Sequence, residues 1–428
     1  MLATWLTACS DDAATSTPGT GGSGAGGSGA AASGGSGALG GSANAGSGGS
    51  AAGTGGASGS SSSGGSAGTG GASSGGVGGA GTGGSGACAA DECPAPNGSV
   101  EWLCRNRFMY GINYAWHHFG GDFGGIPEWN QQGVAANSAA VSTDLADMSA
   151  HGVSAVRWWV FPDFRGDGAT IDGSGTATGL GSTTLADLSR ALELAAQHDL
   201  YLMLTLFSFD GFRPTRVDNG INIPSLQPMV IDQQKRTALL ENVVRPFARA
   251  AEASPNRDRL IAWDVINEPE WAMTGPSPYG DENYSPNSEL TAVTHTQMEV
   301  FVNDVVGVLR QESGALVSVG SAAMKWKRAW SAVDTDFHHF HMYGWVNDWW
   351  PYDQTPAFYG LDDKPIVWGE FPLGNLTATD TYADVVGTWW NIGYAGAMAW
   401  QYNEGTTTQA QLNEVLAFTT QNACEKRY

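Results

Sequence analysis

Basic residues are scarce in this chain of 428 residues, which has 20 Lys and Arg against 42 Asp and Glu and a net charge of −22. A surface with this balance does not attract nucleic acid or anionic membranes, so neither is expected as a partner. The charge favours a neutral ligand. The chain also lacks any run of 18 apolar residues, so no transmembrane helix is expected.

The motifs that bind nucleotides are missing as well. No Gly-x-Gly-x-x-Gly turn follows the first predicted strand, and no P-loop occurs anywhere in the sequence. These absences argue against an open sheet that binds a nucleotide, and we expect no cofactor.

The first quarter of the chain has almost no apolar side chains. Residues 21–90 contain 31 of the 61 glycines, the rest being nearly all Ser, Ala and Thr, and no Lys or Arg precedes Arg105. Such a segment cannot offset its backbone entropy by burying apolar surface, so we expect a disordered linker over 21–90. The remaining 91–428 carry 16 of the 17 tryptophans and should form one barrel-sized domain.

Cysteines are few, and one has a distinctive context. Leu6-Thr7-Ala8-Cys9 resembles the lipobox of bacterial lipoproteins, in which the cysteine becomes the lipidated first residue. The resemblance implies that residues 1–20 are a signal and anchor remnant, that Cys9 is a lipid anchor, and that the protein is extracellular or on the outer cell surface. The basic start and longer apolar region of a signal peptide are not present.

Four further cysteines remain, an even number that suits two disulfides in an exported protein: Cys88, Cys93, Cys104 and Cys424. Because Cys424 lies close to the C-terminus, we expect it to pair with one of the other three and to tie the ends of the domain together. The sequence does not say which.

Short β-rich apolar runs alternate with longer amphipathic segments from residue 107 onward. The predicted strands are 108–113, 153–160, 200–207, 260–266, 315–320, 337–343, 365–370 and 394–400. The predicted helices are 138–151, 184–198, 232–253, 290–311, 382–391 and 409–420, and 345–359 is expected to be a long loop. Eight strands with interposed helices over about 320 residues predict a (β/α)8 TIM barrel, with a doubly wound open sheet as the alternative.

Polar residues gather where the predicted strands end, which is where such barrels carry their chemistry. Two of these residues are glutamates, Glu268 after strand four and Glu370 on strand seven. Those two strands face one another across the barrel mouth. Cleavage of a glycosidic bond requires one carboxylic acid to protonate the leaving oxygen and a second carboxylate to attack the sugar carbon. We therefore expect the two carboxyl groups to flank a sugar substrate.

Four signatures occur in the expected order along these strands: Asn267-Glu268-Pro269, His341-x-Tyr343, Trp368-Gly369-Glu370-Phe371 and Trp400. Together they resemble the clan A glycoside hydrolases, most closely family 5, over roughly residues 107–403. The resemblance implies a (β/α)8 barrel and a retaining hydrolase that acts on a polysaccharide or oligosaccharide. A monomer is expected.

The resemblance also implies roles for individual residues. Glu268 matches the acid/base and Glu370 the nucleophile. Asn267 matches the amide that binds the sugar 2-hydroxyl, and Arg157 matches the strand-two arginine whose charge should keep Glu370 ionised. The surroundings of Glu268 should raise its pKa, because the acid must hold its proton until catalysis.

The remaining matched residues line the same pocket. Tyr343 is expected to hydrogen-bond the nucleophile, His341 to line the site, and Trp400 to stack under the reacting sugar. Further sugar-stacking positions are predicted from the clustered tryptophans: Trp116, Trp271, Trp345, Trp349 and Trp350. Core packing is the alternative for each of these, and core positions are expected for Trp263, Trp368, Trp389 and Trp390.

The three histidines of His338-His339-x-His341 raise the question of a metal. Strand alternation points His339 and His341 to one side and His338 to the other, and no matching Asp or Glu spacing follows, so no metal is expected. Asp264 and Glu270, the acidic neighbours of Glu268, are expected to be solvated or to support the site from behind.

The choice of substrate stays open between β-mannan and β-glucan. Strand three reads Leu206-Phe207-Ser208-Phe209-Asp210 without the histidine of many family 5 enzymes. This departure, with 156–161, is more similar to the β-mannanase branch than to the cellulase branch. The main prediction is a secreted endo-β-1,4-glycanase. The alternatives are an exo-acting β-glycosidase or arabinofuranosidase of the same clan and a non-catalytic carbohydrate-binding surface protein.

Overall fold

The computed structural model describes residues 91–402, 407–426 and 428. Three sequence predictions lie outside these residues: the anchor region 1–20 with Cys9, the linker 21–90, and any pairing of Cys88. None of the helices in the described part of the chain combines the length and apolar character needed to cross a bilayer.

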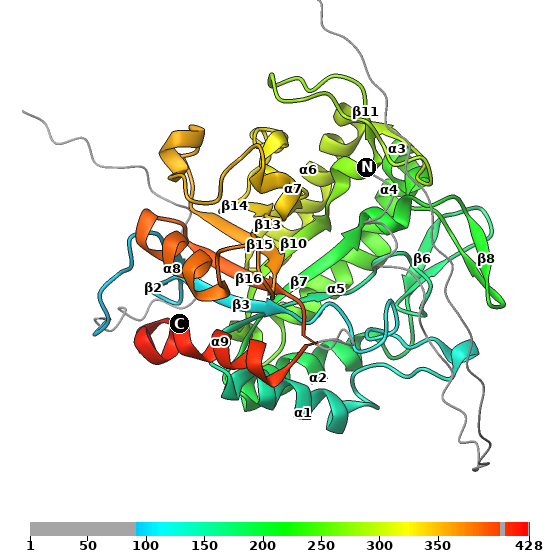
Figure 1. Cartoon of the computed structure of the whole chain (residues 1–428). Helices are drawn as coiled ribbons and strands as arrows, with labels where there is room; N and C mark the ends of the chain where they lie inside the picture. The colour runs from blue at the N-terminus through cyan, green and yellow to red at the C-terminus, as the bar shows by residue number, and fades with distance from the viewer. Residues whose placement is uncertain (1–90, 403–406, 427) are drawn as a thin grey trace, which may run out of the picture. The chain divides into compact units, whose positions relative to one another are not determined.

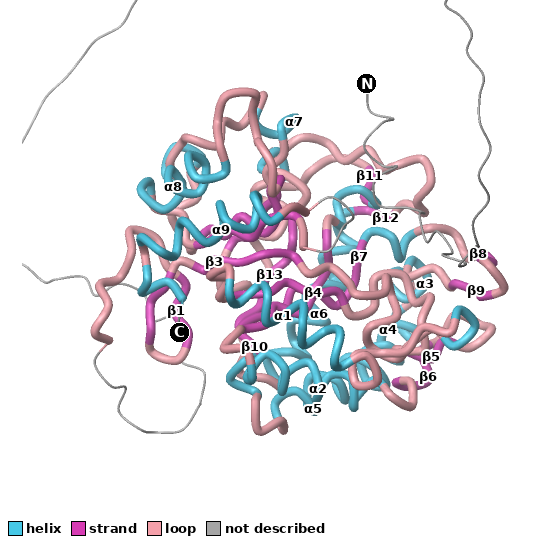
Figure 2. The backbone as a smooth tube through the Cα atoms, turned by 60° about the horizontal axis from the view of Figure 1, so that its bottom comes forward, coloured by secondary structure: helices cyan, strands magenta, loops and turns pink. Residues whose placement is uncertain are grey.

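Eight parallel strands close into a barrel at the centre of the fold (Figures 1 and 2). In chain order they are β3 (Met109–Asn113), β4 (Ala155–Trp159), β7 (Tyr201–Ser208), β10 (Leu260–Asn267), β13 (Leu316–Ser321), β14 (His338–His341), β15 (Ile366–Pro372) and β16 (Gly396–Trp400). Each coincides with a predicted strand. Because β16 pairs with β3 and the sheet has no free edge, the predicted TIM barrel is confirmed and the open sheet is wrong.

The strands form where the sequence is continuously apolar, because helices cover the outside of the barrel and side chains fill its inside. Every residue of β7 and β10 is buried. Inside the barrel, an inner cluster that includes Met109, Tyr201, Met203, Phe337 and Met398 packs below the mouth. This packed interior leaves the carboxyl ends of the strands as the place where polar side chains can meet.

The helices follow the predicted alternation: α1 (Ser138–Ala150), α2 (Thr184–Gln197), α3 (Gln227–Ile231), α4 (Gln233–Leu239), α5 (Arg245–Glu252), α6 (His295–Glu312), α7 (Gly344–Asn347), α8 (Tyr382–Ile392) and α9 (Gln409–Gln421). Figure 2 shows α1, α2 and α5 outside the strands. On α2, the three- and four-residue spacing of Leu185, Leu188, Leu192 and Ala195 predicts one buried face. Leu188, Leu192 and Ala195 are buried as predicted, whereas the prediction is wrong for Leu185, which is exposed.

Two helix predictions and one loop prediction need correction. The segment 232–253 is divided by a π-helical turn, Leu240–Val244, between α4 and α5. The helix predicted from residue 290 begins at His295, because Thr294 and Gln297 form a capping box that ends the preceding extended segment. The predicted loop 345–359 contains part of α7 and a 3-10 turn, Pro356–Tyr359, capped by Thr355.

The loops contain short two-stranded sheets that were not predicted from the sequence. They are β1 (Val100–Trp102) with β2 (Arg105–Arg107), β5 (Ala169–Ile171) with β6 (Ala177–Leu180), β8 (Arg216–Asp218) with β9 (Ile221–Ile223), and β11 (Met273–Thr274) with β12 (Val293–Thr294). Strands of two to four residues are too short for an alternating pattern to be recognised.

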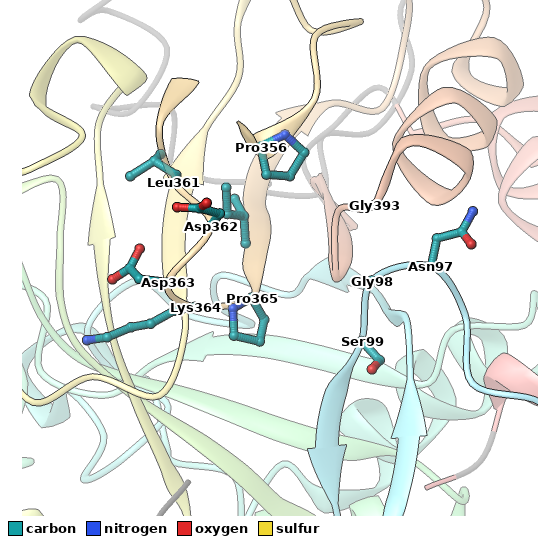
Figure 3. Close-up of a pocket in the computed structure, with 11 residues that line it drawn as sticks. Asn97, Gly98, Ser99, Pro356, Leu361, Asp362, Asp363, Lys364, Pro365 and Gly393 are labelled. Carbon is teal, nitrogen blue, oxygen red and sulfur yellow. The ribbon is translucent and has the colours of Figure 1, made fainter. Parts of the chain in front are cut away.

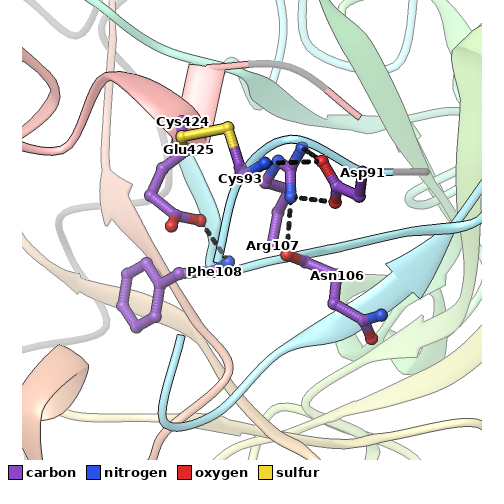
Figure 4. The surroundings of a disulfide bond; sticks show 7 residues. All are labelled: Asp91, Cys93, Asn106, Arg107, Phe108, Cys424 and Glu425. Carbon is purple, nitrogen blue, oxygen red and sulfur yellow. Dashed lines mark hydrogen bonds and ion pairs between the residues drawn. A yellow bond between two sulfur atoms is a disulfide. The ribbon is translucent and has the colours of Figure 1, made fainter. Parts of the chain in front are cut away.

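A disulfide joins the two ends of the described chain, as predicted for Cys424 (Figure 4). Its partner is Cys93, which is 331 residues away, and Cys104 is also disulfide-bonded. Beside this disulfide, Arg107 donates to Asp91, and Glu425 accepts the backbone N–H of Phe108 at 2.6 Å. A crosslink over so long a loop stabilises the fold by about 2–5 kcal/mol, mainly by restricting the unfolded chain.

Candidate functional site

The carboxyl ends of the barrel strands bring the predicted site residues to one rim. Arg157 lies on β4, His341 ends β14, Glu370 lies on β15, and Glu268 directly follows β10. Strand register contributes to this meeting, since Asn113 pairs with Arg157 and His341 with Glu370. The side chains come from strands that are far apart in the sequence.

The two glutamates converge as predicted. One side-chain oxygen of Glu268, one of Glu370 and one ring nitrogen of His341 all lie within 4.8 Å of one another. Both glutamates are largely withdrawn from solvent. The two carboxyl groups are therefore close enough to act on the same small group of a ligand.

Arg157 forms the centre of a buried polar network. Its guanidinium group is fully buried and donates to four side chains, two of them carboxylates and two of them amides. Nη1 reaches Glu370 Oε1 at 2.6 Å and Asn113 Oδ1 at 3.1 Å. Nε and Nη2 reach Asp264 Oδ2 at 3.0 and 2.7 Å, and Nη2 also reaches Asn267 Oδ1 at 2.8 Å. The planar fork thus holds the carboxylate of Glu370 in one orientation.

Glu370 accepts hydrogen bonds at both oxygens. Tyr343 donates its hydroxyl to Oε2 at 2.8 Å, while Arg157 occupies Oε1. Burial raises the pKa of Glu370 above its ordinary value, and the positive charge of Arg157 opposes that rise. The predicted support of the ionised form by Arg157 has a direct structural basis in this contact.

Glu268 has an unusual backbone conformation, with φ 48° and ψ 46° in the left-handed region. Non-glycine residues rarely adopt it, and it costs on the order of 1 kcal/mol or more. Pro269 begins a 3-10 turn, Pro269–Ala272, immediately afterwards. The chain therefore turns sharply at the rim, so that the apolar strand ends with a carboxyl group at the barrel mouth.

Each oxygen of the Glu268 carboxyl group has a partner. Trp271 donates its indole N–H to Oε2 at 2.8 Å, and His341 Nδ1 lies 2.7 Å from Oε1. Burial raises the pKa of Glu268 to about 7, while the Trp271 hydrogen bond and the charge of Arg157 oppose the rise. The carboxyl group can therefore hold a proton near neutral pH, as predicted for an acid.

His341 lies between the two glutamates, with its Nδ1 3.5 Å from Glu370 Oε2. Burial lowers the pKa of His341 to about 4, so the ring is neutral at neutral pH. A neutral ring can share one proton with Glu268 without adding a charge to the site. The predicted alternation is confirmed, because His339 packs beside His341 with ring centroids 5.4 Å apart, whereas His338 contacts Asp363 instead.

Glu268, His341 and Glu370 are also the three side chains in the described residues that are close enough to share a metal ion. Both glutamates, however, already accept hydrogen bonds from Trp271, Tyr343 and Arg157. The guanidinium group places a positive charge at the same point. This donor arrangement suits proton transfer and attack by a carboxylate better than cation binding.

Two asparagines, Asn113 and Asn267, also contact Arg157. Asn113 donates its amide to the backbone carbonyls of Gly369, Met398 and Ala399, and its oxygen accepts from Arg157. Asn267 uses its oxygen to accept from Arg157 as well. Its NH₂ group is therefore the part of the side chain that remains to contact a ligand.

Asp264 and Glu270 are buried, so the solvated alternative for them is wrong. Asp264 accepts from Arg157, from Thr205 Oγ1 at 3.0 Å and from Gly320 N at 2.8 Å. The sequence signal was an acidic residue inside an otherwise apolar strand, which requires a buried partner.

Glu270 anchors the turn that follows Glu268. It accepts from Ser321 Oγ at 2.7 Å, Ala322 N at 3.0 Å and Trp330 Nε1 at 2.8 Å, and burial raises its pKa to about 7. Trp271 lies in the same 3-10 turn as Glu270. The bonds to Ser321 and Ala322 attach this turn to the end of β13.

Two groups of tryptophans flank the carboxyl pair. Trp400 lies 5.4 Å from Trp159 and 6.2 Å from Trp116 between ring centroids, and Arg157 stacks on Trp159 at 4.2 Å. On the other side, Trp271 lies 5.8 Å from Trp345. Trp159 was missed, because its place in an apolar strand resembles an ordinary core position.

The other tryptophan predictions are resolved by burial. Trp263, Trp368 and Trp389 are fully buried core residues as predicted, whereas Trp390 is partly buried against the core. Trp349 is 75% exposed, and Trp350 packs partly against the core. Neither Trp349 nor Trp350 joins the two groups at the carboxyl pair through the ring contacts found in the described chain.

A hollow lies at the start of β15, away from the strand ends that carry the site (Figure 3). Its lining includes Gly98, Lys364, Pro365, Ile366 and Gly393, at the start of β15. The catalytic candidates all lie at the ends of the strands, so this hollow is separate from them.

No protein-family model matches the chain. A mannan endo-1,4-β-mannosidase of Cryptopygus antarcticus is 25% identical over 332 residues, which cover 70% of this chain and 81% of the relative. That of Mytilus edulis is 25% identical over 332 residues, covering 68% of this chain and 83% of the relative.

The comparison with solved structures also finds mannanases, here by their fold. The X-ray structure of the β-mannanase from the blue mussel Mytilus edulis superposes with a TM-score of 0.63 at 22% identity, covering 76% of this chain and 96% of the mussel protein. This chain is therefore similar, over most of the part that forms the barrel, to proteins named mannan endo-1,4-β-mannosidases, and it shares their fold.

Proposed function

We propose that this protein is an endo-β-1,4-mannanase that cleaves its substrate with retention of configuration. The observation that carries the proposal is the approach of Glu268 and Glu370 to within 4.8 Å at the mouth of the barrel. A short carboxyl separation supports retention, because an inverting enzyme needs roughly 6.5–9.5 Å to admit a water. The named relatives support mannan as the substrate.

In this mechanism Glu370 attacks the anomeric carbon while Glu268 protonates the departing glycosidic oxygen. The C–O bond to the leaving sugar breaks, and a glycosyl ester forms on Glu370. Glu268 then takes a proton from water, which attacks the same carbon and releases Glu370. Esterification removes the negative charge of Glu370, so the pKa of Glu268 should fall and turn the acid into a base.

The surrounding residues act on this cycle through the contacts described above. Arg157 and Tyr343 hold Glu370 charged and oriented for attack. The free NH₂ of Asn267 would bind the sugar 2-hydroxyl, a contact that strengthens in the transition state. Trp400 would support the apolar face of the reacting sugar.

Mannan is preferred to glucan for two reasons. Both curated relatives carry mannan in their names, and strand three contains no histidine at Leu206-Phe207-Ser208-Phe209-Asp210. Axial and equatorial 2-hydroxyl groups distinguish the two sugars, and the contacts around this hydroxyl would decide between them.

The test is product analysis on β-mannan, β-glucan, and manno- and cello-oligosaccharides, with the anomer of the first product followed by NMR. We expect a ladder of short manno-oligosaccharides that appear first as the β-anomer. Single mannose units released from one end would indicate exo action. Binding without hydrolysis would indicate a carbohydrate-binding protein, and a first product in the α-anomer would overturn the retaining mechanism.

The pH dependence of kcat/KM follows from the two carboxyl groups. Activity should fall as the pH rises through about 7, because Glu268 then loses its proton. Activity should also fall at acid pH as Glu370 becomes protonated, and this limb should lie above the ordinary pKa of a glutamate, because burial raises the pKa of Glu370. Trp271→Phe removes a hydrogen bond that lowers the pKa of Glu268, so the alkaline limb should move to higher pH. Trp349→Phe, which changes an exposed ring, is the control. An alkaline limb that does not move in Trp271→Phe would contradict the assignment of this limb to Glu268.

We further propose an extracellular location. The disulfide between Cys93 and Cys424 supports an oxidising compartment. The sequence similarity of Leu6-Thr7-Ala8-Cys9 to a lipobox supports attachment to an outer surface through Cys9. Metabolic labelling with a radioactive fatty acid, with Cys9→Ser as the control, tests the anchor.

A further inference from the structure

Lys325 places its ammonium group beside a cluster of three indole rings. Its Nζ lies 4.0 Å from the ring centre of Trp326, 5.6 Å from that of Trp345 and 5.9 Å from that of Trp271. Within the described residues the side chain forms neither a hydrogen bond nor an ion pair. Lys325, Trp271 and Trp345 are each only partly buried. The three N–H donors of Lys325 are therefore available to a ligand.

The fold places this cluster directly beside Glu268. Trp271, Lys325 and Trp345 lie just after β10, β13 and β14, which are consecutive strands of the closed barrel (Figure 1). Trp271 is bonded to Glu268 Oε2, whereas Oε1 faces His341 and, beyond it, Glu370. The cluster thus borders the acid and lies away from the group of Trp116, Trp159 and Trp400, which borders the Arg157 network.

The chemistry of the cluster matches a sugar ring better than core packing alone. Indole faces stack on the apolar face of a pyranose, and an ammonium group donates hydrogen bonds to hydroxyl oxygens. A lysine used only for packing needs a partner for its charge in the surrounding protein or in water. Here the cation lies over aromatic faces, and its donors have no hydrogen-bond partner among the described residues of the protein.

We propose that Lys325 binds a hydroxyl group of the sugar unit on the leaving-group side of the scissile bond, with Trp271 and Trp345 as the walls of that subsite. The proposal rests on the proposed function, because the acid Glu268 protonates the oxygen of this leaving sugar. Lys325 would act on substrates whose leaving group is a sugar and not on those whose leaving group lacks hydroxyls.

The experiment compares Lys325→Met with wild type on two substrates. In mannopentaose the leaving group is a mannose chain, whereas in 4-nitrophenyl β-mannobioside it is a nitrophenolate without hydroxyl groups. A hydrogen bond from a charged donor corresponds to about a tenfold effect or more on affinity. We expect kcat/KM of Lys325→Met to fall roughly tenfold on mannopentaose. The fold-loss on the aryl substrate should be at least about fivefold smaller than the fold-loss on mannopentaose. Lys325→Arg, which keeps the charge and the donors, should recover part of the loss.

Lys364→Met is the matched control, because Lys364 donates to Thr335 Oγ1 near the start of β15, at the other end of the barrel. It should keep both rates within about twofold of wild type, as expected for a surface change far from the site. Calorimetric titration of mannopentaose into Glu370→Gln, with and without Lys325→Met, measures the same contact without turnover and should show weaker binding with Lys325→Met.

The outcomes separate the two proposals. If wild type hydrolyses neither mannan nor manno-oligosaccharides, the proposed function is wrong, and the proposed subsite is wrong as well. If wild type is active but Lys325→Met loses both substrates equally, Lys325 acts through the Trp271–Glu268 contact and the subsite is wrong. Unchanged kinetics and unchanged binding in Lys325→Met would overturn the subsite alone.

Discussion

Replacing Glu370 with Gln should lower kcat/KM on mannan at least about a thousandfold, because the substitution removes the nucleophile itself. The amide keeps the shape of the carboxyl group, and Tyr343 can still donate to its oxygen. The side chain can no longer form the glycosyl ester. Steady-state kinetics on purified protein with soluble β-mannan measures the loss.

Two controls make this result specific. Glu101→Gln changes an exposed glutamate on β1 and should leave the kinetics unchanged. Thermal unfolding of Glu370→Gln should show that it is folded, since loss of one buried charge at the rim leaves the barrel core intact. A folded Glu370→Gln that retains a tenth or more of wild-type activity would exclude Glu370 as the nucleophile.

Arg157→Met should have the second large effect, on stability as well as on activity. Removing the guanidinium group leaves Asp264 and Glu370 buried without their cationic partner. Breaking one side of a buried ion pair destabilises a protein by about 3–5 kcal/mol. Because the charge of Arg157 opposes the rise in the pKa of Glu370, its loss should also move the acid limb of the pH profile to higher pH. Denaturant unfolding and the pH dependence of kcat/KM measure the two effects.

A double variant separates stability from catalysis. Arg157→Met with Asp264→Asn replaces the stranded carboxylate with a neutral amide, so part of the lost stability should return while activity stays low. Arg157→Lys keeps a charge but has one nitrogen in place of the three that contact Asp264, Glu370, Asn113 and Asn267, so it should rescue only partly. If the free energy of unfolding of Arg157→Met lies within about 1 kcal/mol of the wild-type value, the network has no structural role.

Much of the site could be predicted because the strand ends carry it. The apolar run that ends in Asn267-Glu268-Pro269 identifies both a strand and its functional end, and Trp368-Gly369-Glu370 does the same across the barrel. These signals are local, since they depend on the composition and period of a few neighbouring residues. The raised pKa of Glu268 was predicted from the requirement that the acid hold its proton, and the structure supplies its cause, which is burial.

Other members of the site could not be predicted because their role depends on neighbours far away in the sequence. Asp264 shows only an acid inside an apolar strand, and nothing local tells that Arg157 is its partner 107 residues earlier. Trp159 and Lys325 show no pattern at all. The direct contact of His341 with Glu268 likewise follows from how β14 and β10 are placed around the barrel.

The sequence by itself determined the alternation of strands and helices and the two acids at strand ends, since apolar period and buried strand ends are properties of short segments. The tertiary structure alone decided which side chains meet. Closure of the sheet and the register of its strands bring Arg157, Asp264 and Glu370 into one network and set Lys325 among three indoles. Such meetings depend on distances of a few ångströms between residues more than two hundred positions apart, and no local pattern encodes them.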